Sequence, residues 1–357
     1  MDCIDNGGAN NPILSGLLPE EIATVCNMSQ RFQPIQIFQW IARGCASFEE
    51  MTNLPFKERE RLTGTYILRN TVCETVLKDP DGTVKLGIGL YDGSSIETVL
   101  LFDKQGRRTA CVSCQVGCPM GCTFCQTGQL GCLRNLTSNE IVEQFLHLEK
   151  ICGKLDNIVF MGMGEPLLNL DSILKTVDVL THPKGRNLSH RRITLSTSGV
   201  CKGIYALADN KPDIRLAVSL TTADEALRTT LMPVTKANPL SELKKAIRYF
   251  NDKSDKRVTL ELALLKNINT SYEAAQQVRA FAEGLNVHIN LIPWNPVPQL
   301  PYTTPSDSEV RTFYHYLITE KLNVTVRQKR GRTIGGACGQ LGKKGHSKST
   351  KPDTKQI

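Results

Sequence analysis

The stretch Cys111-Val-Ser-Cys114-Gln-Val-Gly-Cys118-Pro-Met-Gly-Cys122-Thr-Phe-Cys125, followed by Cys132, decides how this chain is interpreted. Its core, Cys118-x3-Cys122-x2-Cys125, offers three thiolates from one short loop. A closed zinc site needs four ligands, and a fully ligated 4Fe-4S cluster needs four cysteines. Three cysteines leave one iron of such a cluster open to a small molecule, so we expect Cys118, Cys122 and Cys125 to hold an open cluster. The alternatives are a zinc site completed by Cys114 or Cys132, and buried structural thiols.

Length and composition are those of a soluble globular protein. The 357 residues can form one barrel-sized domain and a smaller one, and 22% of them are charged. No apolar run is long enough to cross a bilayer, and residues 1–8 lack the pattern of a signal peptide. We therefore expect a cytoplasmic protein without membrane contact. The net charge of +8 favours a polyanionic partner such as RNA or DNA.

The chain has 13 cysteines, an odd number, and their clustering does not suggest a secreted disulfide framework. Those with no assigned role are interpreted as free thiols in a reducing compartment: Cys3, Cys26, Cys45, Cys73, Cys114, Cys132, Cys152 and Cys201.

Changes in hydrophobic periodicity divide the chain into four parts. Residues 1–64 are predicted to form a helical accessory domain for docking a partner, after a loose, polar lead over residues 1–15. Residues 65–103 are predicted to be a β-rich extension, with strands at 66–69, 83–90 and 96–102. Residues 104–341 form the main domain, and residues 342–357 a basic, disordered tail.

From residue 109 onward, short apolar runs alternate with amphipathic helices. This alternation predicts an α/β fold in which a parallel sheet with outer helices curls into a partial (β/α)6-type barrel. The chemistry of such barrels gathers at the carboxyl ends of the strands. The expected strands are 109–113, 157–160, 192–196, 215–219, 259–264, 288–292 and 324–327, and expected helices include 139–150, 171–180, 241–251, 272–283 and 306–320.

Each motif of chemical interest follows one of these strands. Met161-Gly-Met-Gly-Glu165-Pro lets the backbone approach a ligand, although it is also compatible with a plain tight turn. Ser196 and Ser219 offer hydroxyls to a ribose or a carboxylate, with a helix N-cap as the alternative. Asn295 is a candidate adenine contact or a satisfied loop asparagine.

Cys338 lies in Gly335-Gly-Ala-Cys338-Gly-Gln-Leu341, just after the last strand. The flanking glycines predict an accessible thiol, and the basic residues that follow are expected to lower its pKa. The alternative is an inert structural thiol.

Several segments together resemble the RlmN/Cfr family of radical S-adenosylmethionine (SAM) RNA methyltransferases. The C-x3-C-x2-C spacing is that of the radical SAM superfamily, in which the open iron chelates SAM. The resemblance runs from about residue 17 to residue 342. Its segments are Gln36-Ile-Phe-Gln-Trp40-Ile, Glu50-Met-Thr-Asn-Leu-Pro, Cys111-Val-Ser-x-Gln-Val-Gly-Cys118, Gly162-Met-Gly-Glu-Pro, Leu195-Ser-Thr-Ser-Gly, Asn290-Leu-Ile-Pro-Trp-Asn-Pro and Ala337-Cys-Gly-Gln-Leu.

The resemblance implies a radical SAM barrel and a mechanism that uses two molecules of SAM per turnover. Cys338 matches the cysteine that is methylated by the first SAM. Cys111 matches the partner cysteine, which helps to remove the ring proton and forms a transient disulfide with Cys338. Glu97 matches a proposed proton acceptor; by chemistry alone it is a surface acid of a strand edge. The positions that match SAM contacts are Gly164, Glu165, Ser196, Ser219, Leu220, Thr221 and Asn295.

Three departures from the family pattern concern substrate handling. Thr221 replaces the usual histidine, Cys114 replaces serine, and residues 332–336 are less acidic than is typical. The implied activity is methylation of adenine carbon 2 in 23S rRNA and in tRNA beside the anticodon. Flavodoxin or ferredoxin is the expected electron donor, and a monomer is the default expectation. The alternatives are a carbon-8 enzyme of the Cfr branch and a non-catalytic RNA-binding paralogue.

Overall fold

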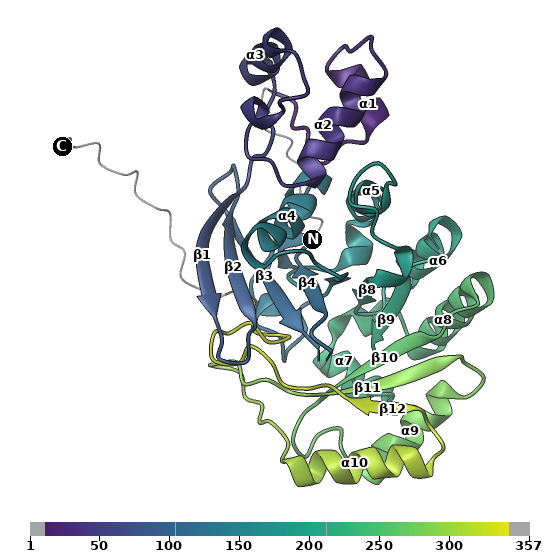
Figure 1. Cartoon of the computed structure of the whole chain (residues 1–357). Helices are drawn as coiled ribbons and strands as arrows, with labels where there is room; N and C mark the ends of the chain where they lie inside the picture. The colour runs from purple at the N-terminus through teal and green to yellow at the C-terminus, as the bar shows by residue number, and fades with distance from the viewer. Residues whose placement is uncertain (1–10, 104, 212, 343–357) are drawn as a thin grey trace, which may run out of the picture.

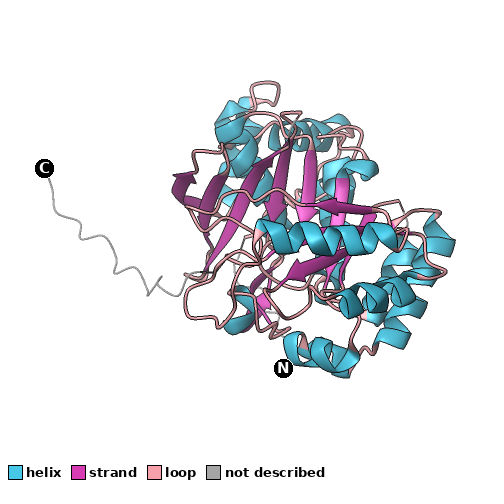
Figure 2. Ribbon diagram, turned by 90° about the horizontal axis from the view of Figure 1, so that it is seen from below, coloured by secondary structure: helices cyan, strands magenta, loops and turns pink. Residues whose placement is uncertain are grey.

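The computed structural model describes residues 11–103, 105–211 and 213–342. Its centre is a ten-stranded sheet in the order β1-β2-β3-β4-β7-β8-β9-β10-β11-β12. The sheet curves into an open barrel whose convex face is covered by helices (Figures 1 and 2). The antiparallel part consists of β1 (Val72–Lys78), β2 (Val84–Gly89) and β3 (Ser95–Phe102), and β3 pairs with β4 (Arg108–Val112).

Seven strands, β4 and β7 to β12, run parallel and confirm the predicted barrel. Each of them lies within two residues of a strand expected from the sequence. Their bounds are β7 (Asn157–Phe160), β8 (Ile193–Thr197), β9 (Arg215–Ser219), β10 (Val258–Leu264), β11 (Val287–Pro293) and β12 (Val324–Val326).

The outer helices are α4 (Ser138–Cys152), α5 (Leu170–Thr181), α6 (Cys201–Asn210), α7 (Glu225–Leu231), α8 (Leu240–Ser254), α9 (Tyr272–Ala282) and α10 (Asp307–Thr319). Alternate strand residues pack beneath them. In β10, for example, Val258, Leu260, Leu262 and Leu264 are buried, whereas Glu261 and the residues in phase with it face the barrel interior. This alternation brings the polar positions of the strands together inside the barrel.

The N-terminal helices α1 (Pro19–Val25), α2 (Phe32–Ala42) and α3 (Phe56–Thr65) lie at one end of the sheet (Figure 1). Their buried side chains, such as Ile22 and Phe38, belong to the same hydrophobic cluster as the barrel core. The prediction of a loose lead is wrong for residues 11–15, because Leu14 is fully buried and Ile13 bridges to Ile67. The basic tail that was predicted over 342–357 lies, after residue 342, outside the described residues.

Two local predictions are also wrong. Residues 66–69 are not a strand, since Tyr66 ends α3 and only the single bridge at Ile67 follows. The strand is instead β1, which is exposed along almost its entire length and therefore lacks the alternation that marks a half-buried strand. The cysteine stretch is not only a loop, because β5 (Gln115–Cys118) and β6 (Gly131–Asn135) pair as an antiparallel hairpin around it.

Candidate active site

The loop that carries the three cysteines is fixed to three other parts of the barrel. The Thr123 amide donates to the carbonyl of Leu231, at 2.9 Å, at the end of α7. The Trp294 indole, just after β11, donates to the Phe124 carbonyl at 2.8 Å. The Gln126 amide donates to the Gly339 carbonyl at 2.8 Å, beside Cys338. This last hydrogen bond fixes the position of the cysteine loop relative to the loop that carries Cys338.

The three cysteines open into one cavity at the carboxyl ends of the parallel strands. The structure brings most of the predicted SAM-contacting residues to the same cavity. Leu220 is the exception, because its side chain is fully buried in the core and does not line the cavity. Site residues that line it are Cys118, Cys122, Cys125, Gly164, Glu165, Ser196, Ser219, Thr221, Asn295 and Cys338.

The two zinc alternatives do not fit this geometry. A Cβ atom added at Gly164 would lie 2.8 Å from the sulfur of Cys114, so Cys114 sits behind the Gly164 backbone and does not line the cavity. Cys132 is disulfide-bonded, which also contradicts its interpretation as a free thiol. Cys26, Cys45, Cys73, Cys114, Cys152 and Cys201 are free, as expected, and Cys3 lies outside the described residues.

The donor set suits a three-cysteine iron–sulfur cluster. Within residues 11–103, 105–211 and 213–342, no three histidine, cysteine or acidic side chains are close enough to share a single metal ion. Burial raises the pKa of Cys118 to about 12 and also raises the pKa of Cys122, an effect that cationic iron would oppose. Cys118, Cys122 and Cys125 would hold the cluster, and its chemistry would be the one-electron reduction of a bound SAM.

Glu165 is a buried carboxylate at the cavity wall. One oxygen accepts hydrogen bonds of 2.7 Å from both the amide and the hydroxyl of Ser198, and the other accepts from the Leu167 amide at 3.1 Å. Burial raises the pKa of Glu165, although these donors oppose the shift. A carboxylate fixed in this way can face an ammonium group. The plain-turn alternative for this motif is therefore incomplete, since the turn also presents Glu165 to the cavity.

The helix-cap alternative for the two serines is wrong. The helices after β8 and β9 begin at Val200 and Asp224 as N-caps, not at Ser196 or Ser219. The hydroxyl of Ser196 instead donates to Glu261 at 3.3 Å across the barrel interior. Both serines line the cavity.

Thr221 has an unusual backbone for a β-branched residue, with a φ angle of 61°. Two hydrogen bonds hold it there. Its amide donates to the carbonyl of Glu261 at 3.0 Å, and its carbonyl accepts from the side chain of Asn269 at 2.9 Å. Strain of this kind persists where the surroundings determine the conformation, and it places Thr221 at the cavity wall.

Asn295 is not a satisfied loop asparagine. Its amide nitrogen donates to the Cys338 carbonyl at 3.2 Å, but its buried Oδ1 atom has no hydrogen-bond partner among the residues that the structure describes. An unpaired buried oxygen costs about 1–3 kcal/mol. A ligand with an amino group, such as adenine, would remove that cost.

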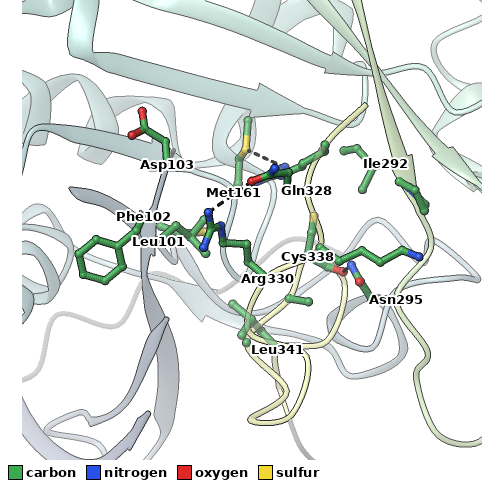
Figure 3. Close-up of a pocket in the computed structure, with 16 residues that line it drawn as sticks. Leu101, Phe102, Asp103, Met161, Ile292, Asn295, Gln328, Arg330, Cys338 and Leu341 are labelled. Atoms are coloured by element: carbon green, nitrogen blue, oxygen red, sulfur yellow. Dashed lines mark hydrogen bonds between the residues drawn. The ribbon is translucent and has the colours of Figure 1, made fainter. Parts of the chain in front are cut away.

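A second pocket adjoins the first one, and Cys338 lines both (Figure 3). The second pocket also contains Cys111 from β4 and Arg327 from just beyond β12. The Nη1 atom of Arg327 lies 3.8 Å from Oε1 of Glu261 and 4.0 Å from the sulfur of Met161. The pocket therefore places two cysteines beside a guanidinium group.

The two thiols have raised pKa values. Burial raises the pKa of Cys338 to about 11 and that of Cys111 to about 12, while Arg327 lowers both. The expectation of a lowered pKa at Cys338 is wrong, because the surrounding protein outweighs the one nearby cation. The expectation of an accessible thiol is confirmed, since Cys338 is exposed to the pocket. The basic residues after Gly342 lie outside the described part of the chain.

Glu97 lies in β3 and lines neither of these pockets. Its carboxylate pairs with Lys85 at 2.7 Å and accepts from the Gly342 amide at 2.7 Å. Lys85 also donates to the carbonyl of Gly335 at 3.3 Å. The pair thus holds both ends of the loop that carries Cys338.

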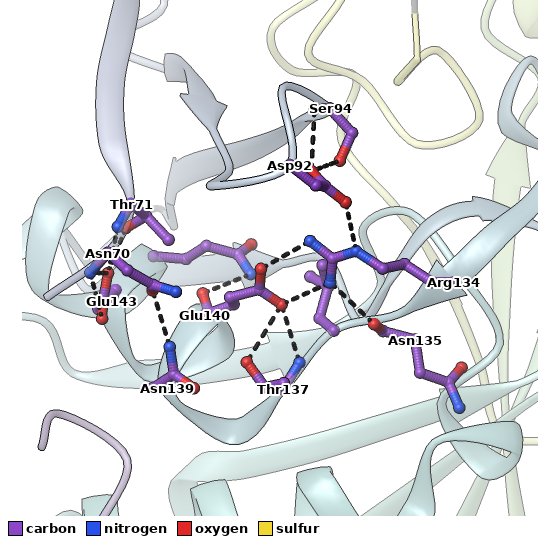
Figure 4. Close-up of polar contacts among 12 residues, drawn as sticks. Asn70, Thr71, Asp92, Ser94, Arg134, Asn135, Thr137, Asn139, Glu140 and Glu143 are labelled. Atoms are coloured by element: carbon purple, nitrogen blue, oxygen red, sulfur yellow. Dashed lines mark hydrogen bonds and ion pairs between the residues drawn. The ribbon is translucent and has the colours of Figure 1, made fainter. Parts of the chain in front are cut away.

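The hairpin beneath the cysteine loop is anchored by a buried ion pair (Figure 4). Arg134 in β6 donates two hydrogen bonds of 2.8 Å to Glu140 in α4, and Asp92 accepts a third bond at 2.6 Å. Glu140 also accepts from the amide of Thr137, which completes a capping box at the start of this helix. These contacts tie the cysteine loop to the first barrel helix.

Sequence reasoning missed three residues of this site: Glu261, Arg327 and Arg228. Glu261 had a signal, because it lies in the opposite phase to the apolar residues of β10 and therefore faces the interior. Arg327 lies close in the chain to Lys329, Arg330 and Arg332, so the sequence gives it no signal of its own. Arg228 is fully buried in α7 and donates to the carbonyls of Ser198, Ser219 and Leu220, and no local pattern marks it.

Comparisons with known proteins agree with this geometry. The Radical SAM superfamily model matches residues 112–277. A relative from Treponema denticola, named "Probable dual-specificity RNA methyltransferase RlmN", is 64% identical over 329 residues, covering 92% of this chain and 95% of the relative. A relative of the same name from Treponema pallidum (strain Nichols) is 58% identical over 330 residues, covering 92% and 97%.

Among solved structures, a radical SAM methyltransferase from Sphaerobacter thermophilus superposes with a TM-score of 0.88 at 38% identity. The match covers 92% of this chain and 99% of that chain. The likeness therefore includes the N-terminal helices as well as the barrel. No helix in the described ranges is long and apolar enough to span a bilayer.

Proposed function

The chain belongs to the RlmN family of radical SAM RNA methyltransferases, and from this premise we propose that it methylates carbon 2 of an adenine in 23S rRNA. We extend the proposal to the adenosine beside the anticodon in tRNA. The observation that carries it is the position of Cys338 between two pockets, one with the three-cysteine loop and the other with Cys111.

In the proposed reaction Cys338 carries the methyl group. Its thiolate takes the methyl of one SAM, so that an S–C bond forms at Cys338 and S-adenosylhomocysteine leaves. When bound, the cluster and a second SAM supply the one-electron chemistry that removes a hydrogen atom from this methyl and accepts an electron after the new C–C bond forms. An electron-donor protein of the flavodoxin or ferredoxin class would supply the reducing electron.

Cys111 then releases the product. We assign the removal of the ring proton to Cys111, which passes the proton to solvent, because the carboxylate of Glu97 is engaged by Lys85 and the Gly342 amide. The Cys111 thiolate attacks the sulfur of Cys338, the S–C bond breaks with its electron pair on carbon, and a proton completes the methyl group. A thiol reductant restores the two cysteines. Arg327 beside both sulfurs favours their thiolate forms.

The test is an anaerobic reaction of the cluster-loaded protein with SAM, a reductant and unmethylated 23S rRNA or tRNA. The RNA is digested, and its nucleosides are compared with 2-methyl- and 8-methyladenosine standards. We expect 2-methyladenosine, and none with Cys338→Ala. An 8-methyladenosine product would replace the proposal by the carbon-8 activity, and RNA binding without either product would support a non-catalytic paralogue.

A further inference from the structure

A separate polar cavity lies at the amino ends of β4, β7, β8 and β9. Four arginines line it, and Asp103 is the one acid in the lining. Arg107 comes from just before β4, Arg191 and Arg192 from just before β8, and Arg215 from the start of β9. We call this cavity the arginine pocket.

The arginine pocket occupies the same inner face of the sheet as the pocket that contains Cys111, Arg327 and Cys338, which we call the reaction pocket. Thr109 lines the arginine pocket and Cys111 the reaction pocket, two residues apart on β4. In the same way, Val159 in β7 lines the arginine pocket, and Met161, just after β7, lines the reaction pocket. Residues two apart on a strand share a face and lie about 7 Å from each other. Asp103 lines both pockets, at the far end of the reaction pocket from Asn295 (Figure 3).

Two of the four arginines, Arg191 and Arg215, make no ion pair with the acids of the described chain. Arg107 pairs with Asp103, and Arg192 donates to the side chain of Asn157 at 3.4 Å. Arg191 and Arg215 are exposed, and neither is within ion-pair distance of a carboxylate in the ranges that the structure describes. Asp213 is close enough to interact electrostatically with Arg191, but it pairs with Lys256 at 2.9 Å. The lining therefore keeps an excess of positive charge, and such an excess in a concave surface concentrates anions.

We propose that the arginine pocket binds the RNA backbone next to the base that enters the reaction pocket. This inference rests on the proposed function. With the target base inserted beside Cys338, the adjoining chain would follow the inner face of the sheet toward Arg191 and Arg215, and their guanidinium groups would bind its phosphates. A step of about 7 Å along β4 is about one extended nucleotide. The arginine pocket thus contributes affinity without reading the sequence.

The test compares RNA binding by the wild-type protein, the double variant Arg191→Gln/Arg215→Gln and the control variant Arg248→Gln. Arg248 is equally exposed but lies on α8, on the outer surface of the barrel. Each cluster-loaded protein is titrated into fluorescently labelled tRNA, and the anisotropy is measured at several salt concentrations. Circular dichroism confirms that all three are folded.

Each arginine that neutralises a phosphate of a single strand contributes about 0.7 to the slope of log K against log salt concentration. We expect the double variant to lose about 1.4 from this slope and to bind at least about tenfold more weakly at low salt. The Arg248→Gln control should match the wild type within about twofold. An unchanged slope in the double variant, or an equal loss in the control, overturns the inference. If the wild type itself fails to bind tRNA or a 23S rRNA fragment, the proposed function fails with it.

Discussion

Replacing Arg228 by methionine should destabilise the protein severely, although the residue is far from any surface. Arg228 is fully buried and has no carboxylate within ion-pair distance in the described chain. Its guanidinium group donates to the carbonyls of Ser198, Ser219 and Leu220, at 2.7, 3.1 and 3.1 Å, and to the hydroxyl of Thr235 at 2.6 Å. These carbonyls belong to the segments that carry the candidate SAM contacts.

The expected loss of unfolding free energy in Arg228→Met is the difference between two opposing contributions. Four hydrogen bonds from a charged donor, at about 2 kcal/mol each, amount to about 8 kcal/mol. Removing a buried charge returns several kcal/mol of desolvation energy, and burial already lowers the pKa of Arg228 to about 10. With about 4 kcal/mol returned, the net loss is about 4 kcal/mol of unfolding free energy.

Urea unfolding of the cluster-loaded protein, followed by circular dichroism, measures this loss. Arg228→Lys keeps the charge with fewer donors and should lose less than Arg228→Met, which covers the case in which the methionine variant does not fold. Arg279→Met is the matched control: Arg279 is 55% exposed, pairs with Glu320 at 3.3 Å and should cost less than about 1 kcal/mol. If Arg228→Met unfolds within about 1 kcal/mol of the wild type, the reasoning is refuted.

Three further predictions concern the same framework. Gly164→Ala should lower the iron content after reconstitution, because the added Cβ would meet Cys114 at 2.8 Å on a backbone with a φ angle of 105°; wild-type iron content would contradict this. Glu140→Leu should cost about 3–5 kcal/mol in urea unfolding, because Arg134 loses its buried partner, and an unchanged midpoint would argue against the anchoring role. Burial lowers the pKa of His147 below 6.5, so its stabilising contribution is full above pH 6.5 and is lost as the pH falls through the folded pKa. His147→Gln should therefore flatten the decline of unfolding free energy below pH 6.5, and parallel curves for the two proteins would contradict this.

The parallel barrel was predictable because its strands are short apolar runs between strongly periodic helices. The site was predictable in outline because each motif follows a strand, and parallel strands bring their carboxyl ends to one edge. Cys118 and Glu165, which lie far apart in the chain, could for this reason be expected in one cavity.

What the sequence did not predict depends on tertiary contacts. The burial of Arg228 depends on four acceptors from three separate segments of the chain, and the sequence of α7 itself gives no sign of it. The pKa of Cys338 is raised because distant parts of the chain bury its thiol between two pockets. The sequence shows only the charged residues that are close to Cys338 in the chain. Strand β1 escaped prediction because it buries almost nothing. Local sequence pattern thus predicts which helices and strands form. The burial and the pKa of a side chain depend on contacts between elements that are distant in the sequence.

The most direct test of the central claim, that Cys338 carries the methyl group to carbon 2, uses SAM with a fully deuterated methyl group. The cluster-loaded protein is reacted anaerobically with unmethylated 23S rRNA in ordinary water, and the nucleosides are analysed by mass spectrometry. Transfer through Cys338 removes one deuterium atom and returns one proton, so the 2-methyladenosine should carry two deuterium atoms. A product that retains all three would show direct methyl transfer and would contradict the account.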